Sequence, residues 1–149
     1  MSGRPRVAFG ATIEVPLPPA QAFVLFTARG ERAWVEGWEP RFPADAPDDT
    51  VPGTVFTTDV GGHETTWLVT ESAPPHRIRY ARLSAPDTAA LVTVQIEAVP
   101  AGSRVRVDYD ATALRPEADD ALRELAAHGE EHVGAWEVLI RRHLDLARA

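Results

Sequence analysis

Two histidines four residues apart, His128 and His132 in the stretch HGEEH, are the first residues whose spacing suggests chemistry. On a helix this spacing places both imidazoles on one face, with Glu131 as a candidate base, as in the H-x-x-E-H motif of zinc peptidases. A site of that type needs a third ligand well downstream, and only 17 residues follow His132. We therefore expect no metal site, and interpret the stretch as a solvated helical turn with one partly buried histidine.

His132 by itself falls on the apolar stripe of the predicted helix, between Gly129 and Trp136. A histidine there is either a core residue bonded to a neighbour or an acid/base group that lines a pocket, because its side chain titrates near neutral pH. Gly129 and Gly134 remove bulk beside it, which either leaves room for a ligand or lets a strand approach closely. The candidate catalytic residues are His132, Tyr109 and Glu71.

Two indoles, Trp34 and Trp38, lie in the charged, glycine-broken stretch GERAWVEGWEP. We interpret them as core residues that also form the mouth of a pocket, where each offers a flat apolar face and an N–H donor to a ligand. Other side chains share the inward phase of their predicted strands or helix. The predicted ligand-binding residues are Trp34, Trp38, Phe56, Trp67, Tyr80, Arg82, Tyr109, His132 and Trp136.

Arg82 and Glu71 are charged residues in phase with these inward positions. Near the ends of their strands they either reach water or pair with each other. If both point inward instead, they hold the polar end of an otherwise apolar ligand.

The elements that must position these residues follow from the hydrophobic periodicity. Alternation of apolar and polar residues predicts strands over 7–15, 54–60, 63–72, 76–83, 89–99 and 104–114. Gly61 and Gly62 predict a two-residue hairpin, because both positions tolerate positive φ. Turns this short require antiparallel neighbours. A proline entry predicts a short helix within 16–28, and 31–36 adds a further turn.

A single long helix is expected at the end of the chain. From Pro116 to about Arg148, apolar residues recur at intervals of three and four, which predicts one helix of about 30 residues. A sheet with one apolar face and a helix with one apolar stripe must cover each other. We predict one α+β domain over residues 1–149, in which a curved antiparallel sheet of six or seven strands wraps around the helix.

This order of elements, with the stretches PLPPAQAFVLFT, GERAWVEGWEPRF and TTWLVTES and the terminal helix with Trp136, resembles the SRPBCC or START-like superfamily. Its helix-grip fold is shared by Bet v 1-like proteins, polyketide cyclases and the activator-of-Hsp90 C-terminal-like family. The resemblance covers nearly the whole chain, and GERAWVEGWEPRF is similar to a bacterial subgroup. It implies an elongated cavity between sheet and helix, closed at one end by the short helices.

Three functions follow from this resemblance. The leading hypothesis is the binding of a small, largely hydrophobic organic molecule. The second is an enzyme similar to polyketide cyclases and aromatases, with acid/base residues in the cavity. The third is a protein-interaction domain similar to the relatives that activate a chaperone.

Composition excludes several other classes. The net charge of −7 disfavours nonspecific binding to nucleic acid or to an anionic membrane. Cysteine is absent, which removes thiolate chemistry and disulfides, and the sequence shows no G-x-S-x-G elbow or glycine-rich phosphate loop. We expect no cofactor, no membrane insertion and, without a signal peptide, a cytoplasmic location. The sequence leaves open whether the chain forms a homodimer.

Overall fold

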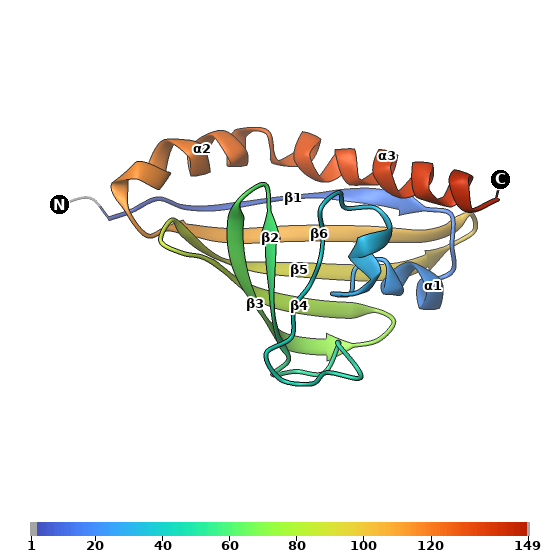
Figure 1. Cartoon of the computed structure of the whole chain (residues 1–149). Coiled ribbons are helices and arrows are strands. Elements are labelled where there is room, and N and C mark those ends of the chain that lie inside the picture. The colour runs from blue at the N-terminus through green and yellow to red at the C-terminus, as the bar shows by residue number, and fades with distance from the viewer. Residues whose placement is uncertain (1–2, 149) are drawn as a thin grey trace.

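An antiparallel sheet forms one layer of the molecule, and helices cover one of its faces (Figure 1). The computed structural model describes residues 3–148. Within them the sheet has six strands, β1 (Arg6–Val15), β2 (Val55–Val60), β3 (His63–Ala73), β4 (Arg77–Ser84), β5 (Thr88–Val99) and β6 (Gly102–Ala113). Their order is β1-β6-β5-β4-β3-β2. After β1, the chain therefore crosses to the opposite edge and returns strand by strand.

The alternation of apolar and charged residues in the sequence corresponds to the two faces of this sheet. On β6, Val105, Val107 and Tyr109 are buried, whereas Arg104 between two buried neighbours is exposed. The Arg104 guanidinium lies 3.1 Å from the Glu14 carboxylate on β1. Apolar burial on one face and charge pairing across strands on the other therefore set the register.

The glycine pair between β2 and β3 forms the predicted hairpin. Gly61 has a φ of 61° and Gly62 a φ of 82°, and the flanking residues Val60 and His63 are paired. Both glycines occupy the left-handed region, which suits the twist of a tight hairpin. In Figure 1, β2 and β3 run across the direction of the long strands β1, β6 and β5.

The helices occupy the two segments expected. They are α1 (Pro19–Val24), the 3₁₀ turns η1 (Gly30–Ala33) and η2 (Pro116–Ala118), α2 (Asp119–Ala127) and α3 (Gly129–Arg148). The two short helices predicted after the first strand are confirmed as α1 and η1. Figure 1 shows α2 and α3 end to end along the sheet, next to β1.

The prediction of one uninterrupted terminal helix is wrong, because α2 ends at Ala127 and α3 begins at Gly129. His128 between them has φ −115° and ψ 21°, outside the helical region. The break coincides with Gly129, which is buried directly against the Phe9 ring of β1. A Cβ at this position would lie 2.6 Å from Cγ of Phe9. Gly129 therefore lets the chain approach the strand closely, which was one of the two alternatives.

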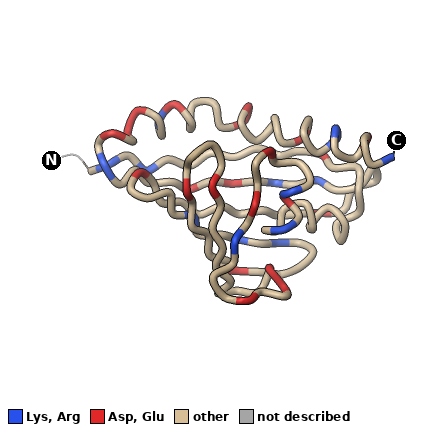
Figure 2. Tube along the Cα trace, in the orientation of Figure 1, with Lys and Arg blue, Asp and Glu red and all other residues tan. Residues whose placement is uncertain are grey.

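Charge along these helices follows the helix dipole (Figure 2). Asp119 and Asp120 lie in the first turn of α2, and Arg148 lies in the last turn of α3. Anions near a helix N-terminus and cations near a C-terminus each contribute about 0.3–1 kcal/mol. No helix within residues 3–148 is long and apolar enough to cross a membrane. The predicted α+β architecture, a curved antiparallel sheet with a terminal helix on one face, is confirmed.

Candidate functional site

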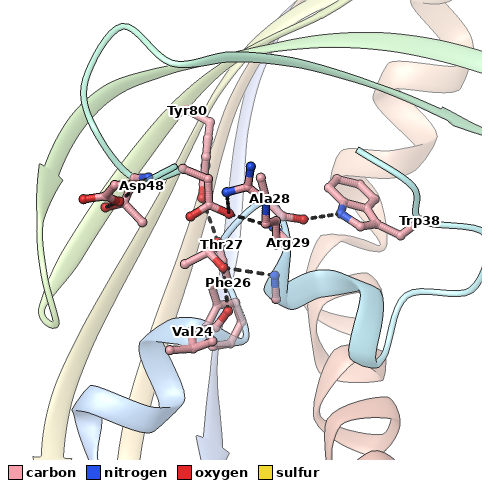
Figure 3. Close-up of polar contacts among 11 residues, drawn as sticks. Val24, Phe26, Thr27, Ala28, Arg29, Trp38, Asp48 and Tyr80 are labelled. Atoms are coloured by element: carbon pink, nitrogen blue, oxygen red, sulfur yellow. Dashed lines mark hydrogen bonds and ion pairs between the residues drawn. The ribbon is translucent and has the colours of Figure 1, made fainter. Parts of the chain in front are cut away.

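Three aromatic side chains hold the segment that follows α1, and Figure 3 shows two of them, Trp38 and Tyr80. The last carbonyl groups of a helix and those just beyond it lack intrahelical partners and need other donors. Here the donors come from the η1 segment and from β4. The three bonds are Trp34 Nε1 to Leu25 O (2.8 Å), Trp38 Nε1 to Ala28 O (2.7 Å) and Tyr80 Oη to Phe26 O (2.8 Å). The segment is thereby attached to the sheet and to η1.

The indole N–H groups of Trp34 and Trp38 are therefore not available to a ligand, and that part of the prediction is wrong. The two side chains are only 7% and 8% exposed, so they present ring faces from within the wall rather than at a mouth. Trp67 likewise donates to Oγ1 of Thr58 at 3.0 Å. Among the described residues, only the Trp136 indole N–H has no hydrogen bond.

A cavity of about 420 Å³ lies between the sheet, η1 and α3. All nine predicted ligand-binding residues line it, namely Trp34, Trp38, Phe56, Trp67, Tyr80, Arg82, Tyr109, His132 and Trp136. Sequence reasoning missed other wall residues, including Phe26, Glu31, Val35, Glu36, Thr58, Val60, Thr65, Val92, Val94 and Leu139. The cavity lies where the resemblance placed it. Whether its residues bind a ligand stays a prediction.

Aromatic rings along the wall contact one another. The ring centroids of Trp38 and Trp67 are 5.6 Å apart at 65°, and those of Trp34 and Trp136 are 5.6 Å apart at 51°. Phe56 stacks on Trp67 at 5.8 Å with nearly parallel planes. Such pairs each contribute about 0.5–1.5 kcal/mol beyond simple burial. Packed rings therefore stiffen the wall in two groups, one that joins Trp38 to β2 and β3 and one that joins Trp34 to α3.

The cavity meets solvent where its lining residues are exposed. These residues are Glu36, His63, His132 and Leu139. They come from the η1 segment, the β2–β3 hairpin and α3.

Arg82 lies at the junction of two chambers. A second cavity of about 330 Å³ extends under α2 and shares His63, Thr65, Arg82 and Tyr109 with the first. The Arg82 Nε is buried without a hydrogen-bond partner among the described residues, and its guanidinium carbon lies 5.6 Å from the Trp67 ring centroid. An unpaired buried donor costs about 1–3 kcal/mol. Arg82 is therefore a donor without an acceptor in the protein.

Tyr109 and His132 face each other beside this junction, with ring centroids 6.3 Å apart. Burial raises the pKa of Tyr109 to about 12, so its phenol stays protonated at neutral pH. His132 is exposed at the edge of the cavity, but loss of solvent on the side that faces the protein, together with the positive charge of Arg82, lowers the pKa of its imidazole below the ordinary value. The pair therefore offers a neutral imidazole and a phenol O–H.

Glu31 is the ionisable wall residue that sequence reasoning did not single out. It lies on η1, three residues before Trp34, and it lines the same cavity. The residue is half-buried among the wall residues of the cavity, and burial raises the pKa of its carboxyl group to about 8. The spacing of three between Glu31 and Trp34, which places both on one side of a 3₁₀ turn, was the available signal.

The prediction that Glu71 belongs to the inward set is wrong. A β-bulge shifts the register between Val69 and Glu71, so that Glu71 pairs with Arg79 rather than with an inward residue. Its carboxylate lies 3.2 Å from the Arg77 Nε and 3.8 Å from an Arg79 nitrogen on the outer face. Alternation predicted the opposite face because one extra residue inverts it. Glu71 therefore pairs with neither Arg82 nor a ligand in the cavity, and is removed as a catalytic candidate.

The HGEEH stretch does not bring its histidines together. His128 is exposed, and its Nε2 lies 3.1 Å from the Glu124 carboxylate, whereas His132 contacts Tyr109 and Trp136. Within residues 3–148, no group of three or more His, Cys, Asp or Glu side chains is arranged to hold a metal ion.

Comparison with known proteins relates the chain to a family and to solved structures. The family described as polyketide cyclase / dehydrase and lipid transport matches residues 6–131. Comparison with curated proteins yields no match.

Three solved structures illustrate the likeness of the fold. An uncharacterised protein from Rhizobium leguminosarum is 20% identical, with 94% of this chain and 97% of that chain covered at a TM-score of 0.68. Norcoclaurine synthase from Thalictrum flavum is 12% identical, with 99% of both chains covered at a TM-score of 0.67. DynU16, from the dynemicin biosynthetic locus, is 16% identical, with 83% of this chain and 47% of that chain covered at a TM-score of 0.60.

Identities this low establish a shared fold and nothing about a shared reaction. The family match, however, extends from β1 to the first residues of α3 and includes the cavity walls formed by the sheet and the η1 segment, whereas His132, Trp136 and Leu139 of α3 lie beyond it. A sheet that closes on a terminal helix around a hollow is also the arrangement that the resemblance implied. The chain therefore belongs to the polyketide cyclase / dehydrase and lipid transport family, within the SRPBCC superfamily of proteins with a Bet v 1-like helix-grip fold.

Proposed function

We propose that this protein binds a small, largely hydrophobic organic molecule in the cavity between the sheet and α3. The observation that carries the proposal is a hollow of about 420 Å³ with a stiff aromatic wall. Ligand sites in proteins usually span about 300–1,000 Å³, with apolar walls and a few placed polar groups. The family's description, which includes lipid transport, supports the same class of ligand.

Arg82 supplies the polar contact that orients the molecule. Its buried Nε has no acceptor in the protein, and the Tyr109 phenol beside it has no hydrogen bond among the described residues. A carbonyl, hydroxyl or carboxylate oxygen of the ligand would satisfy both donors. The ligand is therefore an apolar body with an acceptor oxygen directed at the junction of the two chambers.

The test is a titration with N-phenyl-1-naphthylamine, a neutral apolar dye whose emission rises in dry surroundings. We expect dye emission to rise, tryptophan emission to fall and the melting temperature to increase. Val60 on β2 lines the cavity, whereas Val55 on the same strand faces outward and lines a groove on the other face of the sheet. Val60→Phe should weaken dye binding at least about tenfold, which corresponds to a loss of about 1.4 kcal/mol in binding free energy. Val55→Phe should leave dye binding unchanged. No binding, or equal binding by both variants, would remove the proposal.

A second candidate is proton-transfer catalysis similar to that of polyketide cyclases. It is favoured by the presence of Glu31, Tyr109 and His132, three acid/base groups with shifted pKa values, in one cavity. The direct measurement is hydrogen–deuterium exchange at the α-carbon of 2-acetylnaphthalene, followed by NMR. Acid/base catalysis contributes about 10²–10⁴-fold, so His132→Ala or Tyr109→Phe should return exchange towards the buffer rate with the fold intact. Exchange at the buffer rate with the wild-type protein would exclude this activity for simple aryl ketones.

A further inference from the structure

Glu31 is a carboxyl group inside an aromatic cavity, and no other side chain compensates it. Within residues 3–148 it has no side-chain hydrogen bond and no ion pair. The nearest cations along the chain are engaged elsewhere. Arg29 lies 3.9 Å from Asp49 and over the Phe42 ring, and Arg32 lies 3.5 Å from Glu39. Glu31 therefore occupies a position where its charge is unfavourable unless a partner enters the cavity.

The other ionisable groups around the cavity do not supply this partner. Tyr80 donates its hydroxyl to the Phe26 carbonyl, and Tyr109 stays protonated. Negative charge at Glu31 contributes to the raised pKa of both phenols, which places Glu31 within electrostatic reach of each. Arg82 forms no ion pair with Glu31 among the described residues, so it does not neutralise this carboxylate directly.

On the basis of the proposed function, we infer that Glu31 binds a basic nitrogen and that the ligand is an apolar amine whose body fills the aromatic cavity. A carboxylate and an ammonium group form a charge-assisted hydrogen bond, which is stronger than a neutral one. The surrounding rings add attraction for a cation, because each aromatic face carries negative charge density. A neutral alcohol of the same shape would gain neither contribution.

The test compares two probes of the same shape, 2-(1-naphthyl)ethylamine and 2-(1-naphthyl)ethanol. A primary alkylamine, like the lysine side chain, stays protonated up to about pH 10. At pH 9 the wild-type protein should bind the amine at least about tenfold more tightly than the alcohol, as expected for one charge-assisted hydrogen bond. Tryptophan quenching and titration calorimetry both report the dissociation constants.

The pH dependence of amine affinity needs no variant. With a pKa of about 8, Glu31 is about one tenth ionised at pH 7 and about nine tenths ionised at pH 9. Amine affinity should therefore rise about tenfold over this interval, whereas alcohol affinity should stay constant. His132 is neutral throughout, since its pKa is lowered, and Tyr80 and Tyr109 remain protonated. Glu36 and His63 lie at the exposed edge of the cavity, where solvent screens them.

Glu31→Gln keeps the shape of the side chain and removes its charge. It should abolish both the preference for the amine and the rise with pH while leaving alcohol binding within about twofold. Glu39→Gln removes the same charge from an exposed position of the same segment and should behave as the wild type.

Equal binding of the two probes by the wild type, or a preference for the amine that survives Glu31→Gln, would overturn the inference and leave the proposed function standing. If neither probe binds to any variant, the proposed function and the inference fall together.

Discussion

Gly129 and Gly134 lie five residues apart on α3, and the structure predicts opposite effects for their replacement by alanine. Helix propensity alone predicts that both changes stabilise the protein, by up to about 1 kcal/mol each. At Gly134, a Cβ would meet no atom within 4 Å beyond the helix itself. At Gly129, it would lie 2.6 Å from Cγ and 2.7 Å from Cβ of Phe9. These atoms belong to the base of the ring, so a rotation of the side chain does not relieve the contact.

Phe9 also cannot move away freely, because its ring stacks on Tyr109 at 4.9 Å and 7°. Insertion of a methyl group into a packed core costs about 1–3 kcal/mol, and the position of the contact favours the upper part of that range. After subtraction of the propensity gain, Gly129→Ala should destabilise the protein by about 1–2 kcal/mol. For a chain of this length, 1 kcal/mol corresponds to about 2–4 °C in melting temperature. We therefore expect the melting temperature to fall by about 2–8 °C in Gly129→Ala and to rise by about 1–4 °C in Gly134→Ala.

Thermal unfolding and urea unfolding followed by circular dichroism both measure these shifts. Urea slopes equal to that of the wild type would show that the denatured state is unchanged. If Gly129→Ala were as stable as the wild type, or if both variants shifted in the same direction, the close approach of α3 to β1 would be refuted.

Three further predictions concern the cavity wall. Tyr80→Phe should lower the free energy of unfolding by about 1–3 kcal/mol in urea, because the Phe26 carbonyl loses its donor; a loss below about 0.5 kcal/mol would contradict this bond. Glu31 has a folded-state pKa of about 8, above its unfolded value near 4.5, so wild-type stability relative to Glu31→Gln should fall as pH rises from about 5 to 8 and then level off. Parallel stability profiles for these two proteins would show that Glu31 is solvated. Arg82→Met should raise stability by about 1 kcal/mol, since the unsatisfied donor costs more than the cation–π contact with Trp67 contributes; a clear destabilisation in urea would reveal a partner for Arg82.

The strands and most of the inward set could be predicted from sequence because both depend on local periodicity. Val105, Val107 and Tyr109 alternate with charged residues over the whole length of β6, and no irregularity interrupts them. The predicted face of Glu71 was wrong because a bulge depends on how neighbouring strands pair, and the sequence of a single strand does not encode this pairing.

The helix break and the importance of Glu31 have a similar origin. Gly129 is compatible with a continuous helix until Phe9 of a distant strand approaches it. Glu31 has the sequence context of an exposed residue, and only the assembled walls of the cavity remove water from around it. Both features depend on long-range contacts.

The bonds from Trp34, Trp38 and Tyr80 to the main chain after α1 limit how the pocket can be redesigned or can diverge. Exchange of one of these rings to admit a bulkier molecule would also release a peptide carbonyl that the fold needs satisfied. Val92 and Val94 line the cavity from β5 and form no side-chain hydrogen bond to the main chain. Substitutions at these two positions can therefore reshape the cavity at the smallest cost in stability. New ligand specificities should therefore arise first through substitutions on β5, while Trp34, Trp38 and Tyr80 stay constant.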